Sequence, residues 1–222
     1  MNNIAPITTL SQVISGYFIK GKNPIDLVEL DKKTINNTIK GLSVIEDRSS
    51  GLMKFVENYR KFSKLPDPEI KEINLSKLVN DCILADCILA VSTYSDFDKI
   101  KLNKKVSSDI YIKTDAQLLS QVIHNLLKKA YESLTESKME QSAIEVYLNK
   151  DKQFTNIEII NNGPEIPTEI KEQIFVPFYS TKKNGSGVGL SLSKQMMLKM
   201  NGDIYFKQTN DQKTCFVVSF SN

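Results

Sequence analysis

The sequence has little of what marks a disulfide-bonded or metal-rich protein. Its 222 residues include no tryptophan, one histidine and three cysteines. The cysteines, Cys82, Cys87 and Cys215, are odd in number and show no CxxC spacing, so we expect buried apolar side chains in a reducing compartment rather than a metal or redox site. With 41% hydrophobic and 25% charged residues, the composition is globular and excludes collagen-like and mostly disordered classes.

Long hydrophobic runs and an excess of one charge are also missing. The richest apolar stretch, residues 82–91, is interrupted by Asp86 and falls short of the roughly 18 residues that a membrane helix needs. No basic region followed by an apolar run marks a secretion signal. We expect a soluble, cytoplasmic chain without direct membrane contact. The alternative of a membrane anchor upstream of this chain in the parent protein stays open. The 29 basic and 26 acidic side chains are interspersed and leave a net charge of +3, so we expect no nucleic-acid partner.

The first 65 residues show helical periodicity. Apolar residues three and four apart form a stripe over residues 4–18, and a heptad-like pattern covers residues 27–65 after a loop. Two such helices make a hairpin with too little surface to be stable alone. We therefore expect residues 1–65 to form a homodimeric four-helix bundle. The alternative is a hairpin that packs on its own domain.

The segment Pro66-Asp67-Pro68 ends the second helix, because proline cannot continue it, and we place the second domain at residues 69–222. There we expect helices at residues 75–91, 115–134 and 188–200, and strands at residues 110–113, 143–149, 155–161, 203–207 and 213–220. Asn74 or Ser76 is expected to cap the first helix and Asp115 the second. The mixture predicts an α+β fold, a helical hairpin followed by an α/β two-layer sandwich with a mixed sheet. A doubled pentapeptide, DCILA at 81–85 and 86–90, has no structural repeat period and receives no function.

Four groups of residues in this domain are candidates for chemistry. A polar stripe, Gln121, Asn125, Lys129 and Glu132, shares one face of the helix that begins at Asp115. A turn, NNGPEIP at 161–167, follows an apolar strand, and an aromatic and hydroxyl cluster, FVPFYSTK, occupies 175–182. The fourth group, GSGVGL at 185–190, opens a helix, where glycines permit close backbone approach and the helix start favours a phosphate.

Each group alone has an ordinary explanation. The alternatives are a solvated helix face, a common Asn-Gly turn, a loop pinned by aromatic packing and a flexible glycine loop. The four groups in this order are a stronger signal than any one of them.

The region from about residue 115 to 205 resembles the catalytic ATP-binding domain of bacterial sensor histidine kinases, whose fold is shared with DNA gyrase, the ninety-kilodalton heat-shock chaperone and mismatch-repair ATPases. QVIHNLLKKAYESL resembles the N box of the family, NNGPEIP its first glycine box, IFVPFYSTK its F box and GSGVGL its second glycine box. The F box is not found in the gyrase and chaperone relatives. Residues 1–65 resemble the dimerisation and histidine-phosphotransfer hairpin, and NNIAPITTL is similar to the stretch after the accepting histidine.

The resemblance implies a kinase that moves the γ-phosphoryl group of ATP to a protein histidine with the help of Mg²⁺, as a homodimer that serves a response regulator. It implies catalytic roles for Asn125 and Lys182, with Asn125 also a metal ligand. The implied nucleotide-binding residues are Asn125, Lys129, Asn161, Gly163, Ile166, Phe178, Thr181, Lys182, Gly185, Gly187, Val188, Gly189 and Leu190. Because the second glycine box and the F box match the pattern, we expect a lid over the phosphates to form.

Several positions depart from the family pattern. The accepting histidine would lie just upstream of Met1, and the only histidine, His124, lies in the N box, where we expect a structural or nucleotide-adjacent group. Unless residues precede Met1, autophosphorylation at the usual site is not expected. Lys129 stands where the family has a Mg²⁺ ligand, and an ammonium has no lone pair for a metal, so use of Mg²⁺ is doubtful.

Two departures fall in the first glycine box. Asn161 stands where the family has the aspartate that accepts a hydrogen bond from adenine, and a neutral acceptor is weaker than a carboxylate. Glu165 stands where a glycine permits close backbone approach. Two hypotheses follow: the core of a two-component histidine kinase, or a degenerate domain that binds nucleotide or a partner without catalysis. An ATPase or serine-directed kinase on the same fold is disfavoured by the heptad hairpin.

Overall fold

The computed structural model describes residues 4–20, 23–24, 31–63, 65–93, 99–137, 141–182, 187–209, 211 and 213–222. The chain divides into two compact units, Met1–Lys64 and Leu65–Asn222. Two expectations lie outside the described residues: the role of Gly185 and the start of the second helix at residues 27–30.

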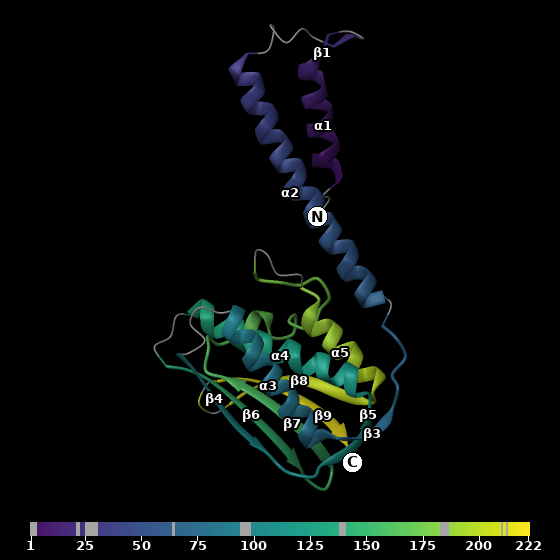
Figure 1. Ribbon diagram of the computed structural model, residues 1–222, viewed down its shortest axis with the longest axis vertical. Coiled ribbons are helices and arrows are strands. Elements are labelled where there is room, and N and C mark those ends of the chain that lie inside the picture. The colour runs from purple at the N-terminus through teal and green to yellow at the C-terminus, as the bar shows by residue number, and fades with distance from the viewer. Residues whose placement is uncertain are drawn as a thin grey trace. The chain divides into compact units, whose positions relative to one another are not determined.

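The first unit is a helical hairpin (Figure 1). Helix α1 (Ile4–Phe18) packs against α2 (Lys32–Ser63), and two short strands, β1 (Ile19–Lys20) and β2 (Asn23–Pro24), pair antiparallel. Asp31 caps α2, since its Oδ1 accepts a hydrogen bond from the backbone N–H of Thr34 at 2.6 Å. The helical periodicity of the sequence thus predicted both helices.

The second unit is a two-layer sandwich in which three helices cover one face of a five-stranded sheet (Figure 1). The sheet has the order β4-β6-β7-β9-β8. Its strands β4 and β6 are parallel and the other neighbours are antiparallel, so the predicted mixed sheet and α+β class are confirmed. The elements of the sandwich are α3 (Leu75–Thr93), α4 (Ala116–Ser137), α5 (Gly189–Lys199), β4 (Ile100–Val106), β6 (Ser142–Lys150), β7 (Phe154–Asn161), β8 (Gly202–Gln208) and β9 (Thr214–Ser221).

Two strands were not predicted. Strand β3 (Lys71–Asn74) pairs antiparallel with β5 (Tyr111–Thr114) in a separate small sheet, and β4 is the outer strand of the large one. Strand β4 reads IKLNKKV, and as an edge strand it needs only three inward apolar side chains, Ile100, Leu102 and Val106, which pack against the core. Lysines on an edge strand are common because they oppose pairing with other chains. They also dilute the alternation by which strands are recognised in a sequence.

The core lies between the helices and the sheet. The buried side of α4 contains Leu119, Val122, Leu126 and Ala130, as predicted, all at most 2% exposed. Strands β6, β7 and β9 supply most of the facing layer. Cys82 and Cys215 are buried free thiols, as expected, but Cys87 is only half-buried. Burial raises the pKa of Cys215 to about 12, so its thiol is unreactive.

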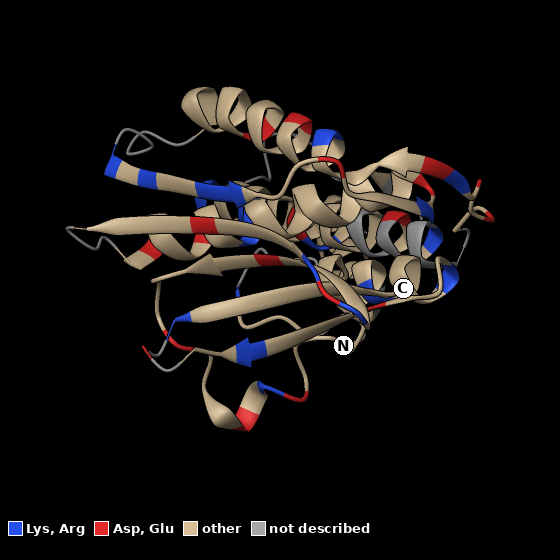
Figure 2. Ribbon diagram, turned by 90° about the horizontal axis from the view of Figure 1, so that it is seen from below, with Lys and Arg blue, Asp and Glu red and all other residues tan. Residues whose placement is uncertain are grey.

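Charges are spread over both faces of the second unit (Figure 2). Surface pairs of opposite sign include Lys207 with Glu158 and Lys213 with Glu145, at 2.7 and 2.8 Å. Among the helices that the structure describes, none is long and apolar enough to span a bilayer.

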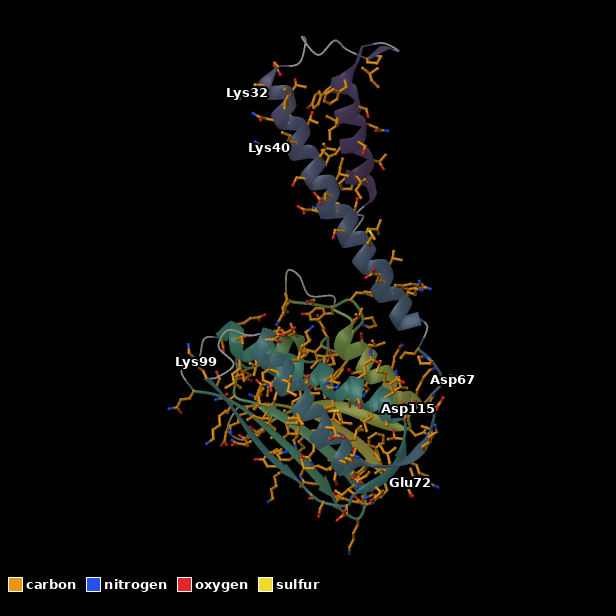
Figure 3. The ribbon with its side chains drawn as sticks, viewed as in Figure 1. Lys32, Lys40, Asp67, Glu72, Lys99 and Asp115 are labelled. Carbon is orange, nitrogen blue, oxygen red and sulfur yellow. The ribbon has the colours of Figure 1, made fainter. Side chains whose placement is uncertain are left out.

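Asp115 connects the small sheet to α4, at the position labelled in Figure 3. Its Oδ1 accepts hydrogen bonds from the backbone N–H groups of Gln117 and Leu118, at 2.8 and 2.9 Å, and its Oδ2 from that of Glu69 at 2.8 Å. Burial raises the pKa of Asp115, but these three bonds and the charge of Lys71 outweigh it and hold the pKa below its ordinary value. The carboxylate therefore caps α4 and holds the segment that leads into the domain.

We expect Asp115→Ala to lower the free energy of unfolding at pH 7 by about 1–2 kcal/mol, the usual loss for an N-cap. The folded pKa of Asp115 is depressed, so its contribution is fully present above the unfolded pKa and is lost as the pH falls through the folded value. Urea titrations at pH 7 and pH 3 check this. Asp115→Asn, which keeps a capping oxygen, is the control and should lose less. A deficit that persists unchanged at pH 3 would contradict the ionised cap.

Candidate functional site

The site is built on the side of α4 that faces α5. Asn125, near the middle of α4, donates a hydrogen bond from Nδ2 to the Oγ of Ser193 in α5 at 2.9 Å. Ser193 is buried, so this bond joins the two helices beneath the surface. The polar stripe of α4 is therefore not only a solvated face, because part of it contacts the second half of the domain.

Gly189, the first residue of α5, lies against Asn125. A Cβ built on Gly189 would stand 2.7 Å from Asn125 Oδ1, which is closer than real Cβ contacts. The N-cap residue of α5, Val188, makes no capping hydrogen bond through its side chain. The start of a helix presents N–H groups and a partial positive charge that attract anions. Close approach at Gly189 thus places an anion-attracting helix start beside the Asn125 amide.

Gly187, two residues before α5, is hydrogen-bonded to Phe178 of the F-box segment, and we call this contact the clasp. The backbone N–H of Phe178 donates to the carbonyl of Gly187 at 2.9 Å. Phe178 and Gly187 both have a positive φ, 65° and 66°. A Cβ on Gly187 would meet the backbone carbonyl carbon of Phe178 at 2.5 Å. Only glycine fits at position 187, so the clasp depends on it.

An ion-pair cluster lies at the other end of the stripe. Glu132 Oε2 accepts hydrogen bonds from Lys129 Nζ at 2.9 Å and from Lys182 Nζ at 3.2 Å. Lys182 Nζ also donates to Glu136 Oε1 at 2.7 Å, and Lys128 Nζ lies 4.0 Å from Glu132 Oε1. We call these five residues the Glu132 cluster. It holds Lys182, from the F-box segment, against α4.

The charges of the Glu132 cluster reinforce one another. Burial raises the pKa of Glu132, but the hydrogen bonds and charges of Lys129 and Lys182 outweigh it, so the pKa lies below its ordinary value. Burial lowers the pKa of Lys182, and Glu136 and Glu132 together outweigh this, so that pKa is raised. Both groups are therefore ionised at neutral pH.

The first glycine box forms a tight turn at the end of β7. Asn161 is 3% exposed, and its Oδ1 accepts a hydrogen bond from the backbone N–H of Gly163 at 3.0 Å. A Cβ on Gly163 would stand 2.5 Å from the Oγ of Ser133 in α4. The turn thus lies against α4 one residue beyond Glu132. The carboxamide oxygen that was expected to accept from adenine is engaged within its own turn.

Glu165 does not crowd the turn. Its side chain is 46% exposed, and its carboxylate lies 3.6 Å from Lys171 Nζ. Of the remaining predicted residues, Ile166 and Leu190 pack against the core, Val188 is buried and Thr181 is exposed. The structure brings Asn125, Val188 and Gly189 together, and separately joins Lys129 to Lys182 through Glu132.

Ser193, Ser133 and Glu136 were not predicted. Ser193 follows Gly189 by one helical turn, so its spacing could have indicated it. Glu136 follows Glu132 by one turn of α4 in the same way. Ser133 has no comparable signal, because its role depends on where β7 ends.

His124 lies on the side of α4 that faces α3. Its Nδ1 lies 2.6 Å from Asp86 Oδ2. Burial raises the pKa of Asp86, the hydrogen bond and charge of His124 lower it, and burial prevails. The pair lines a cavity of about 480 Å³ between α3 and α4, together with Leu89, Lys128 and Tyr131. Asn125 also borders this cavity. The contact with Asp86 gives His124 a structural partner, and its nearness to a nucleotide stays a prediction.

The side chains around Lys129 do not fit Mg²⁺, whereas the role of Asn125 as a metal ligand stays a prediction. The cation prefers an octahedral shell of oxygen ligands, and an ammonium group offers no lone pair. In the described parts of the chain, no three His, Cys, Asp or Glu side chains lie together as a metal site. The carboxylate nearest to Lys129, that of Glu132, already accepts from two ammonium groups.

Known proteins share this architecture. Residues 114–222 match the family model of the histidine kinase-, DNA gyrase B- and HSP90-like ATPase. The signal transduction histidine-protein kinase AtoS of Escherichia coli is 26% identical over 204 residues, covering 89% of this chain and 32% of AtoS. Sporulation kinase A of Bacillus subtilis is 23% identical over 220 residues, covering 96% of this chain and 35% of the relative. The chain thus spans about a third of the length of these relatives.

Among solved structures, the catalytic domain of histidine kinase ThkA superposes with a TM-score of 0.59 at 24% identity, over 69% of this chain and 95% of that one. ThkA solved in complex with the response regulator protein TrrA gives a TM-score of 0.63 at 23% identity, over 98% of this chain and 59% of that one. These likenesses show the fold. With the family match and the kinase relatives, they lead to one conclusion: residues 114–222 form an ATPase domain of the sensor histidine kinase family.

Proposed function

We propose that this chain is the kinase core of a two-component system, which binds ATP between α4 and α5 and transfers its γ-phosphoryl group to a histidine of a protein. The observation that carries the proposal is the contact of Gly189 with Asn125, which sets the start of α5 beside the polar face of α4. In a domain of this family, that juxtaposition provides N–H groups, an amide and lysines for a polyphosphate.

The residues of the site supply position and charge. The phosphates lie at the start of α5, where the clasp between Phe178 and Gly187 shapes the approach, and Lys182 neutralises their charge. Asn125 Nδ2 is held by Ser193, which leaves Oδ1 directed at Gly189 and orients the amide. A nitrogen–phosphorus bond to the histidine forms as the bond from the γ-phosphorus to the bridging oxygen breaks, and ADP leaves. Such transfers depend mainly on positioning and electrostatics.

The hairpin unit is proposed to form the dimer. Along α2, positions 38, 45 and 52 are half-buried, whereas Ile35, Leu42 and Val56 are 45%, 52% and 55% exposed. Positions 38, 45 and 52 are therefore partly covered within the hairpin, whereas Ile35, Leu42, Val56 and also Tyr59, which is 55% exposed, are available for a second copy. Light scattering at micromolar concentration should give the mass of a dimer. A monomer would contradict this arrangement.

A response regulator is the proposed recipient of the phosphoryl group, by analogy with the complex of ThkA and TrrA.

The second candidate function is a domain that binds nucleotide without catalysis. It is favoured by Lys129, whose ammonium stands in the N box and cannot hold a metal.

The proposed function is tested by titration calorimetry with ADP and by transfer of labelled phosphate from ATP to a separate histidine-bearing hairpin. We expect ADP to bind and the hairpin to be labelled on histidine. Binding without labelling would favour the non-catalytic domain. Absence of ADP binding under every condition would contradict both candidates.

A further inference from the structure

We propose that this site binds the nucleotide phosphates directly through Lys129 and Lys182, without a divalent cation. The inference rests on the proposed function, because it concerns how the same site neutralises ATP or ADP. It follows from the chemistry of the Glu132 cluster, whose ammonium groups have no lone pair for Mg²⁺ and whose carboxylates already accept hydrogen bonds from lysines.

The two lysines share one carboxylate oxygen. Lys129 Nζ and Lys182 Nζ donate to Glu132 Oε2 at 2.9 and 3.2 Å. Their side chains are 34% and 35% exposed, so each ammonium is half-covered and still reachable from solvent. Although 53 residues separate them in sequence, α4 and the F-box segment thus hold both positive charges around one point.

This arrangement excludes a metal at Glu132. Mg²⁺ would have to displace both ammonium groups from the same oxygen and then lie beside two like charges. It also demands a near-octahedral set of oxygen ligands. Within the described residues, the only other carboxylate of the cluster, that of Glu136, already accepts from Lys182 at 2.7 Å.

The same arrangement suits phosphate oxygens. Each ammonium has three donors, and Glu132 satisfies only some of them. Charge-assisted hydrogen bonds to a phosphate are of the same kind as those now made to Glu132. Two ammonium groups also carry the same formal charge as one divalent cation. Glu132 therefore occupies the lysines when no nucleotide is bound, and a polyphosphate competes with it for them.

The experiment is calorimetric titration of the full chain with ADP and with a non-hydrolysable ATP analogue, in EDTA and in Mg²⁺. We expect the dissociation constants in the two buffers to agree within about threefold. Lys129→Asn should weaken binding in EDTA by about tenfold or more, the effect of one lost charge-assisted contact. Lys101→Asn, on the edge strand β4, removes the same charge elsewhere and should leave both constants unchanged.

Glu132→Gln supplies an independent test. It removes the competing carboxylate, so binding in EDTA should become severalfold tighter, and weaker binding would contradict the competition. Thermal unfolding without nucleotide establishes that each variant is folded. Wild-type binding that requires Mg²⁺ would overturn this inference and leave the proposed function intact. Absence of binding in both buffers would overturn the proposed function as well.

Discussion

Replacing Gly187 with alanine should reduce the affinity for ADP by about a hundredfold. Gly187 has φ +66°, and an added Cβ would lie 2.5 and 2.8 Å from the carbonyl carbon and oxygen of Phe178 and 2.8 Å from the carbonyl oxygen of Tyr179. These are backbone atoms and cannot rotate away. The left-handed conformation costs a non-glycine residue about 1–2 kcal/mol, and the overlap adds about 1–3 kcal/mol. Since about 2.7 kcal/mol equals a hundredfold, opening of the clasp is expected to remove most binding.

Calorimetric titration with ADP, beside circular dichroism of the same sample, measures this effect. Gly51→Ala is the matched control, because a Cβ at Gly51 of α2 meets no heavy atom within 4 Å. That variant should bind ADP as the wild type does and gain about 0.5–1 kcal/mol of helix stability. Wild-type affinity of the Gly187→Ala protein would show that the clasp does not shape the site.

The second large effect is expected for Leu126→Ala in α4. Leu126 is fully buried beside Asn125, with its side chain in the layer between helices and sheet. Truncation removes its contacts and leaves a cavity, which typically costs about 3 kcal/mol. The melting temperature of the second unit should fall by about 6–12 °C. Calorimetric or circular-dichroism melting of the full chain provides the measurement.

Leu84→Ala in α3 provides the control for this truncation. The two residues lose the same atoms, but Leu84 is 62% exposed, so its change should stay within about 0.5 kcal/mol. If both variants lost equal stability, Leu84 would have to be covered by another molecule in solution. Equal and small losses would contradict the assignment of Leu126 to the core.

Much of the second unit could be predicted because its signals are local. Asn74 caps α3, with its Oδ1 accepting from the N–H of Lys77 at 2.9 Å, and Asp115 caps α4. Strands β6 and β7 alternate apolar and polar residues on either side of a polar segment, Asp151 to Gln153, so both strands were predicted with ends within one residue of those observed. Side-chain periodicity and capping need only neighbours in sequence.

The doubled pentapeptide, DCILA at 81–85 and 86–90, shows burial differences that the local sequence could not predict. Five residues of an α-helix turn through about 140° beyond one full turn, so the two copies face different surroundings. Ile83 in the first copy is 3% exposed, whereas its counterpart Ile88 is 67% exposed. Asp86 of the second copy is buried against His124, while Asp81 of the first is exposed. Identical residues thus acquire different roles from helix rotation and packing.

The candidate site likewise contains residues that the motifs predicted and contacts that only the folded structure shows. Sequence motifs alone predicted Asn125, Lys182, Gly187 and Gly189 as site residues, because the boxes have specific residue types at specific spacings. Motifs could not show that Asn161 Oδ1 is taken up by Gly163, or that Glu165 turns to Lys171. Those contacts depend on which atoms the folded chain brings within hydrogen-bonding or ion-pairing distance of each side chain.

By itself, then, the sequence determined the helices, most strands, the α+β class and the resemblance to a kinase ATPase domain, since these follow from periodicity, caps and motifs within short windows. Only the tertiary structure decided the edge strand β4, the contact of Gly189 with Asn125 and the shared carboxylate of Glu132. The bonds from Lys182 to Glu132 and from Asn125 to Ser193 join residues 50 and 68 positions apart. Such pairs meet only when the helices pack on the sheet, because hydrophobic burial, not local propensity, sets their distance.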